Sequence, residues 1–173
     1  QCGTNPAPKQ GFWCGACFLL RSRINMELKS PVFKNNQFIP SKYTCDGEDI
    51  NPPLKISAIP KNTKSLTLIV DDPDASGGTF VHWIVWNINP VIRKIFENSI
   101  LSGAIEGLTD FGKTGYGGPC PSSGIHHYQF KLYALDTKLK FLSLADADKI
   151  ELERAMGGHI LAKANLVGLY QRR

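Results

Sequence analysis

The chain has no long hydrophobic run. None of its apolar stretches approaches the roughly 20 residues that a transmembrane helix needs. The longest uncharged stretch near the start, residues 11–20, is short and lacks the basic leader and cleavage site of a secretory signal. We therefore expect no transmembrane segment and a cytoplasmic location, with a periplasmic or secreted location as the alternative. Peripheral membrane contact stays compatible with this composition.

The chain also lacks a concentrated basic segment. Its 20 Lys and Arg exceed its 15 Asp and Glu by five, but they are spread along all 173 residues. No arginine-rich arm and no mixture of aromatic and basic residues typical of nucleic-acid binding is present. Internal repeats and low-complexity segments are absent as well. These absences exclude a nucleic-acid partner, and the length predicts one folded domain.

Cysteine is scarce outside the first 25 residues, which hold three of the five. We expect residues 1–25 to be a poorly ordered extension and residues 26–173 to form the domain. The motif WCGAC at 13–17 resembles the redox motif of thioredoxin-like proteins, but no strand-like run precedes it. Only Cys2 and no histidine lies nearby, so zinc could be bound there only between chains. We expect no cofactor and no metal.

The remaining chain is rich in short β-favouring runs. Seven prolines between residues 31 and 90 separate them, which predicts an all-β sandwich or barrel. Helix is expected mainly near the C-terminus, where Ser143 and Asp146 resemble a capping box and a short helix would end at residue 155 or 156. Gly157 and Gly158 would stop it, and the run 166–170 would form a closing strand.

Polar residues lie at the ends of three strand-like runs, 66–70, 80–88 and 126–134. Because side chains alternate between the two faces of a strand, Asp72 shares the apolar face of the first run. The same rule places His82 on the face of Phe80, Ile84 and Trp86. The third run follows the rule too: it places His126 with Tyr128 and the apolar residues beyond, and His127 on the opposite face.

A buried carboxylate or imidazole is costly unless it is paired, so these three polar groups need partners or a ligand. If the first two runs form a hairpin, Asp72 and His82 meet at one sheet edge, and the carboxylate would orient the ring. His126 could reach the same edge. The glycine-rich loop 115–118, including Gly118, could offer main-chain N–H groups to a ligand. Together with a Tyr128 hydroxyl, these groups predict a small pocket for phosphate or carboxylate.

Several motifs in order resemble the phosphatidylethanolamine-binding protein family, in its bacterial and archaeal branch of Raf kinase inhibitor-like proteins. The resemblance runs from about residue 33 to residue 172. The motifs are YTCDGEDINPPL at 43–54, DPDA at 72–75, HW at 82–83, TDFGKTGYGGPCP at 109–121, GIHHYQFKLYALD at 124–136 and GHILAKANLVGLYQR at 158–172.

This resemblance implies an antiparallel β-sandwich with Greek-key strands and a few short peripheral helices. It also implies a non-enzymatic binding module that holds phosphate, phosphorylethanolamine or acetate, and that inhibits a kinase or a protease. The residues that match the family's cavity are Asp72, His82, Pro119, His126 and Tyr128. Two positions depart from the family pattern: Ser76 stands where proline is common, and His127 stands where arginine is common.

Two other functions fit the same residues. In a hydrolase, His82 and His126 would transfer protons, and Cys120 or Ser122 would be the nucleophile. Cys120 has a simpler interpretation as a small buried residue or as a disulfide partner, for example of Cys45. In a metal site, Asp72, Asp74 and the two histidines would bind a divalent ion, an interpretation that the resemblance disfavours.

Overall fold

The protein is described here by a computed structural model that covers residues 25–99, 101–140 and 147–172. The predicted extension therefore lies almost wholly outside the described residues. The strands are β1 (Glu27–Lys29), β2 (Gln37–Phe38), β3 (Leu54–Ser57), β4 (Ser65–Asp72), β5 (Phe80–Ile88), β6 (Lys94–Ile95), β7 (Ile105–Glu106), β8 (His126–Leu135) and β9 (Ile160–Tyr170). The helices are a 3-10 turn, η1 (Ser41–Tyr43), and α1 (Lys149–Met156).

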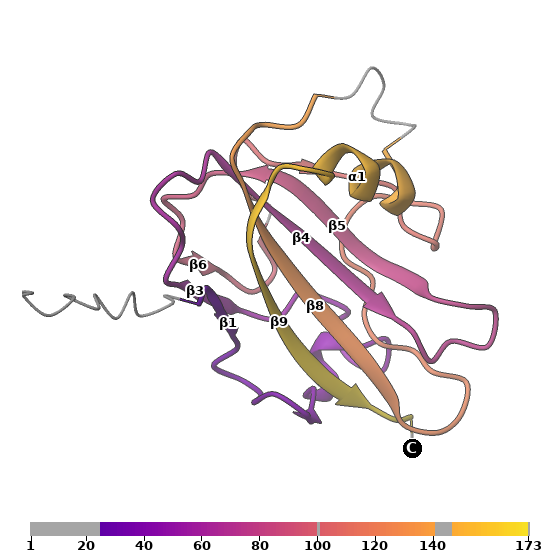
Figure 1. The fold of residues 1–173 in the computed structure, drawn as a ribbon. Coiled ribbons are helices and arrows are strands. Elements are labelled where there is room, and N and C mark those ends of the chain that lie inside the picture. Colours follow the sequence, from indigo (N-terminus) through magenta and orange to yellow (C-terminus); the bar gives the residue numbers. More distant parts are fainter. Residues whose placement is uncertain (1–24, 100, 141–146, 173) are drawn as a thin grey trace, which may run out of the picture.

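The strands form two sheets (Figure 1). The large sheet has the order β2-β9-β8-β4-β5-β7, and the small sheet has the order β1-β3-β6. All pairs are antiparallel except β2 with β9. Because β8 returns by a long connection to lie beside β4, the segment β8-β4-β5-β7 has Greek-key order. The mainly-β fold predicted from the sequence is confirmed.

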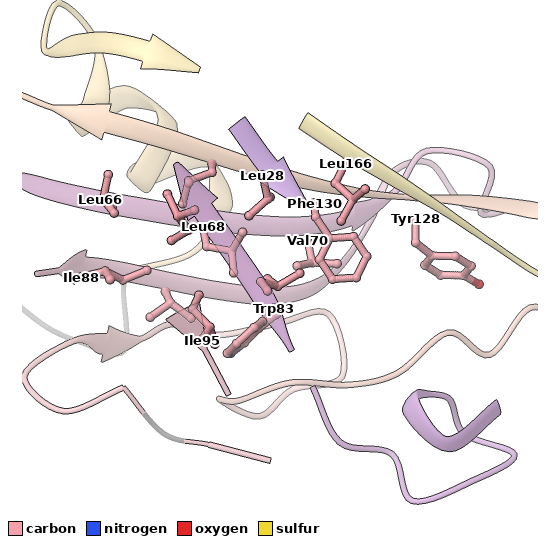
Figure 2. Packing of buried hydrophobic residues seen from close by; sticks show 14 of the residues in the cluster. Leu28, Leu66, Leu68, Val70, Trp83, Ile88, Ile95, Tyr128, Phe130 and Leu166 are labelled. Atoms are coloured by element: carbon pink, nitrogen blue, oxygen red, sulfur yellow. The ribbon is translucent and has the colours of Figure 1, made fainter. Parts of the chain in front are cut away.

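The main core lies between the two sheets. Alternate residues of β4, namely Leu66, Leu68 and Val70, pack with Leu28 of the small sheet and Phe130 of β8 (Figure 2). All five are at least 96% buried. Burial of apolar area at this density supplies the main favourable term in folding. The alternation predicted for the first and third runs is therefore confirmed.

Helix α1 covers the opposite face of the large sheet. Its buried residues Leu152 and Met156 pack on a second cluster that includes Ile69, Ile84 and Trp86. The helix begins later than predicted, because its cap is Asp148, whose side chain accepts a hydrogen bond from the N–H of Glu151. The proposed capping box at 143 and 146 lies outside the described residues.

The C-terminal boundaries are partly as predicted. The helix ends at Met156, directly before the two glycines, as expected. The closing strand is longer than expected, because β9 begins at Ile160 and pairs with β8 along its whole length. The inward positions of its first half include Ala162 and Ala164, and alanine is depleted in strands, so this half carries little strand propensity. No helix in the described ranges is long and apolar enough to cross a membrane.

Candidate functional site

A cavity of about 180 Å³ opens where β4 ends and where β5 and β8 begin. It is lined by Asp72, Ala75, Ser76, Phe80, His82, Phe111, Cys120, Pro121, Ser122, His126 and Tyr128. Four of the six site residues predicted from the sequence, Asp72, His82, His126 and Tyr128, thus meet at one place. The other two, Gly118 and Pro119, do not line the cavity.

His82 reaches the cavity because β5 is interrupted there. In the register with β4, Val70 faces Trp83 and Asp71 faces Val81, so His82 is the extra residue of a β-bulge. A bulge shifts the alternation of its strand by one residue. The prediction that His82 shares a face with Ile84 and Trp86 is therefore wrong, since both pack in the cluster under the helix.

Asp72 pairs with His126. Its Oδ2 lies 2.6 Å from Nδ1 of His126, while its Oδ1 accepts the main-chain N–H of Asp74 at 2.9 Å. The expected pairing of Asp72 with His82 is wrong. Since a carboxylate only accepts, Nδ1 of His126 carries a proton, and Nε2 is the atom left for a ligand.

His82 is held by the main chain instead. Its Nδ1 lies 2.8 Å from the carbonyl oxygen of Gly117, and its own carbonyl oxygen accepts the Gly117 N–H at 2.9 Å. Burial lowers the pKa of His82, although the carbonyl of Gly117 and the charge of Asp72 act in the opposite direction. The ring is therefore neutral at pH 7 with its proton on Nδ1, which makes Nε2 a hydrogen-bond acceptor.

Tyr128 contributes a buried hydroxyl group. The residue is 1% exposed, and its hydroxyl makes no hydrogen bond of normal geometry within the described part of the chain. Burial, followed by the negative charge of Asp72, raises the pKa of Tyr128, so the hydroxyl keeps its proton at neutral pH. A buried donor without a well-formed hydrogen bond is unfavourable, and a ligand in the cavity would remove that cost.

The glycine loop does not present its N–H groups to the cavity as predicted. The N–H of Gly117 binds the carbonyl of His82, and the N–H of Gly118 donates to Asp49 Oδ1 at 2.6 Å. Pro119 lies behind the cavity, where its carbonyl accepts the N–H of Cys45 at 3.2 Å. These residues shape the cavity wall from behind, and the donors in the cavity are side chains.

Gly118 is required for close packing, which gives a first prediction. A Cβ there would lie 2.6 Å from Asp49 Oδ1 and 2.8 Å from the main chain of Tyr43 and Thr44. We expect Gly118→Ala to lower the free energy of unfolding by about 1–3 kcal/mol, measured by urea denaturation. Gly77→Ala is the control, because nothing lies within 4 Å of its added Cβ. Equal stability of the two variants would contradict this packing role.

The only two cysteines in the described ranges form a disulfide. Cys45 and Cys120 are bonded with a Cα–Cα distance of 5.4 Å, and Cys120 lines the cavity. The disulfide alternative for Cys120 is therefore confirmed, and its sulfur is not a free nucleophile. Such a bond forms in an oxidising environment, which the predicted cytoplasmic location does not ordinarily provide.

The two departures from the family pattern lie on different sides of the cavity wall. Ser76 lines the cavity. His127 points away from it and binds Asp74 twice, through its main-chain N–H at 2.8 Å and through Nδ1 at 2.7 Å. The hydrogen bond from the His127 side chain lowers the pKa of Asp74. His127 therefore fixes the loop that follows Asp72 and contributes no group to the cavity.

The metal-site alternative finds no support in the geometry. Asp72 and Asp74 are each occupied by a different histidine, and no group of three His, Cys, Asp or Glu side chains in the described ranges is arranged to hold a metal ion.

The predicted shared face of His82 and Phe80 is confirmed, since both line the cavity, but sequence reasoning missed Phe111. Phe111 packs edge-on against His82, with ring centroids 5.2 Å apart, and Phe80 lies at the same distance from that ring. Phe111 belongs to a loop without periodicity, so only its place in the motif TDFGKTGYGG marked it.

The fold and the cavity together define a two-sheet β-protein with a small polar pocket. The profile of the family "phosphatidylethanolamine-binding protein" matches residues 29–171. The chain therefore belongs to this family, as the motifs predicted.

Individual relatives agree with this assignment. A UPF0098 protein of Pyrococcus horikoshii is 55% identical over 86% of this chain and 78% of its own length. Another, of Methanothermobacter thermautotrophicus, is 46% identical over 85% of this chain and 99% of its own length.

Solved structures show the same fold. The crystal structure of a Chlamydia trachomatis protein described as a putative phosphatidylethanolamine-binding protein homolog is 41% identical. It covers 87% of this chain and 99% of its own, with a TM-score of 0.82. YbcL of Escherichia coli, described as a member of the mammalian family, is 29% identical, covers 86% of this chain and 99% of its own, and has a TM-score of 0.79.

Proposed function

We propose that this protein is a non-enzymatic binding protein whose cavity holds a small anion, with phosphate and the phosphorylethanolamine headgroup as the ligand class. One observation carries the proposal: the buried Tyr128 hydroxyl lies in the cavity wall and makes no hydrogen bond of normal geometry to a described residue, although Asp72 and the main chain of Cys120 lie close enough to act on its pKa. The Nε2 atoms of His82 and His126 are the further groups left for a ligand. The volume of about 180 Å³ suits a headgroup rather than a whole lipid.

The charge state of the histidines sets the conditions for binding. In the free protein, the lowered pKa of His82 leaves its Nε2 as an acceptor at pH 7. An anion that carries no proton can accept a hydrogen bond from Nε2 of His82 only when that nitrogen has taken up a proton. Binding is then coupled to protonation, so affinity for such an anion rises as the pH falls towards the lowered pKa of His82 in the free protein, and it levels off below that pKa.

The hydrolase alternative has less support. Cys120 is held in the disulfide, and Ser122 makes no hydrogen bond to a histidine within the described ranges. The regulatory role that the resemblance implies, inhibition of a kinase or protease, would depend on the binding step, and our proposal concerns that step.

Titration with anions tests the proposal. We expect phosphate, phosphorylethanolamine and sulfate to shift the imidazole NMR signals of His82 and His126 at millimolar concentration. Sulfate stays a dianion between about pH 5 and 8. The expected loss of sulfate affinity as the pH rises through this range therefore reports on the protonation of the protein's histidines. Unchanged histidine signals would refute the anion site, and release of free phosphate from phosphorylethanolamine would favour the hydrolase.

A pair of tyrosine variants makes this test specific. Tyr128→Phe removes this hydroxyl and is expected to weaken anion binding about 5- to 10-fold, the usual range for one hydrogen bond. Tyr133→Phe is the matched control, because Tyr133 packs on the opposite face of the sheet. Equal affinities of the two variants would contradict a role for Tyr128 in the site.

A further inference from the structure

Strand β9 has a free edge along its first half. On one side it pairs with β8 over its whole length, whereas on the other side it pairs with β2 only at Gly168 and Leu169. The paired edge stops at Val167, whose N–H donates to Asn35 Oδ1 and whose carbonyl accepts the N–H of Asn36. Residues 160–166 have no strand partner on this side within the described ranges.

The free edge presents main-chain hydrogen-bonding groups at regular intervals. The carbonyls of Val167 and Leu169 point towards β2. In an antiparallel strand the groups of every second residue point to the same side. The N–H and C=O groups of Lys163 and Asn165 therefore point outward, and no described residue binds them. Leu161 is the extra residue of a β-bulge opposite Ala134 and Leu135, where this alternation is broken. An edge of this kind is a template for one more strand.

A groove of about 840 Å³ runs beside this edge. It lies between β9 and β1, the edge strand of the small sheet, which are close neighbours in Figure 1. Its apolar lining residues include Met26, Leu28, Phe33 and Leu166, which are buried members of the main core. Side chains on one face of an added strand would thus meet an apolar surface.

The groove carries excess positive charge. Lys29, Lys34 and Lys163 line it, against the single acidic residue Glu27. Lys29 and Glu27 form an ion pair at 2.6 Å. Lys34 and Lys163 form no ion pair with any described residue, although Lys163 lies 5.5 Å from the ring centroid of Tyr133. Two unneutralised cations favour an acidic partner.

Charge argues against two other occupants. If a second copy added its β9 antiparallel about the centre of the free edge, Lys163 would face Lys163, and like charges directly opposite are destabilising. The first 24 residues of this chain contain Lys9, Arg21 and Arg23 and no acidic residue. Neither complements the groove.

We propose that the free edge of β9 and this groove bind an extended segment of another protein in which apolar and acidic residues alternate. The segment adds as a strand to Lys163 and Asn165. Its apolar side chains enter the groove, and its acidic side chains lie beside Lys163. Because the groove shares no lining residue with the anion cavity, this inference is independent of the proposed function.

A labelled peptide tests this inference. We expect a fluorescein-labelled heptapeptide of alternating valine and glutamate to bind in fluorescence polarisation at low salt, and more weakly in 0.5 M salt. In NMR spectra, the amide signals of Lys163 and Asn165 should shift. Two control peptides should bind at least about tenfold more weakly. One alternates valine and lysine, and the other contains the same valines and glutamates as the first peptide, with all the valines before all the glutamates.

Variants separate the edge from general charge effects. Lys163→Glu should weaken binding at least about tenfold, whereas Lys61→Glu, the same charge change in a turn outside the groove, should change it less than twofold. Asn165→Pro removes one outward N–H and leaves the bonds to β8, so it should also weaken binding. The inference is overturned if the peptide does not bind, if Lys163→Glu binds it as well as the unchanged protein, or if the amide shifts fall on the cavity instead.

Discussion

Replacing Asp71 by alanine is expected to lower the free energy of unfolding by about 3–5 kcal/mol, the range for breaking a buried ion pair by removing one partner. Asp71 is completely buried on the helix side of the large sheet. Its Oδ2 accepts from Lys131 at 2.8 Å and from Lys149 at 2.7 Å. Without the carboxylate, Lys131 loses its ion-pair partner and Lys149 keeps only Glu153 at 3.9 Å, where the two lysines are only 26% and 18% exposed.

Urea denaturation followed by the fluorescence of the buried Trp83 and Trp86 measures this loss. Asp136→Ala is the matched control. Asp136 accepts from His159 at 2.8 Å, but about half of each side chain is exposed, so the change should be below about 1 kcal/mol. If Asp71→Ala is no less stable than Asp136→Ala, the buried network does not hold α1 on the sheet.

Removing the Cys45 to Cys120 disulfide is expected to cost about 4 kcal/mol of stability. The bond closes a loop across a sequence separation of 75 residues, and the chain-entropy relation gives a value of this size for such a loop. We expect Cys45→Ser, Cys120→Ser and the double variant to lose the same free energy of unfolding, because each removes the same bond.

Reduction of the unchanged protein with dithiothreitol should reproduce this loss, and thiol counting before and after should show two more new thiols than in the Cys45→Ser, Cys120→Ser double variant. The contacts of Pro119 with Cys45 and of Gly118 with Asp49 still join the two loops in the reduced protein. The reduced form should therefore fold and bind anions at low denaturant. A double variant as stable as the unchanged protein would contradict the expected contribution of the disulfide.

The strands that frame the cavity could be predicted because their periodicity is local. In β8 the alternation of apolar and polar residues continues without interruption from His126 to Ala134, so parity placed His126 and Tyr128 on the correct face. The same holds for Asp72 at the end of β4. Each of these predictions needed only the residues of one strand.

The partners of the polar groups could not be predicted, because they depend on distant segments. β4 lies between β5 and β8, and the sequence does not say which neighbour meets the Asp72 carboxylate. The N–H of Gly118 binds a residue 69 positions away, and His82 binds one 35 positions away. Asp71 gave no signal either, since its lysines come from β8 and α1.

The extra residue in β5 bears on how such a site can arise. With His82 left out, Val70 would still face Trp83 and Asp71 would still face Val81, so this end of the β4–β5 pairing does not need it, while a second irregularity lies between Leu66 and Leu68. A single inserted codon at this end of β5 would thus place an imidazole at the sheet end and leave the pairing of Val70 with Trp83 and of Asp71 with Val81 in register. Functional novelty of this kind requires no change to the hydrophobic core, and a chain that lost the insertion would keep the fold while losing this ring from the cavity.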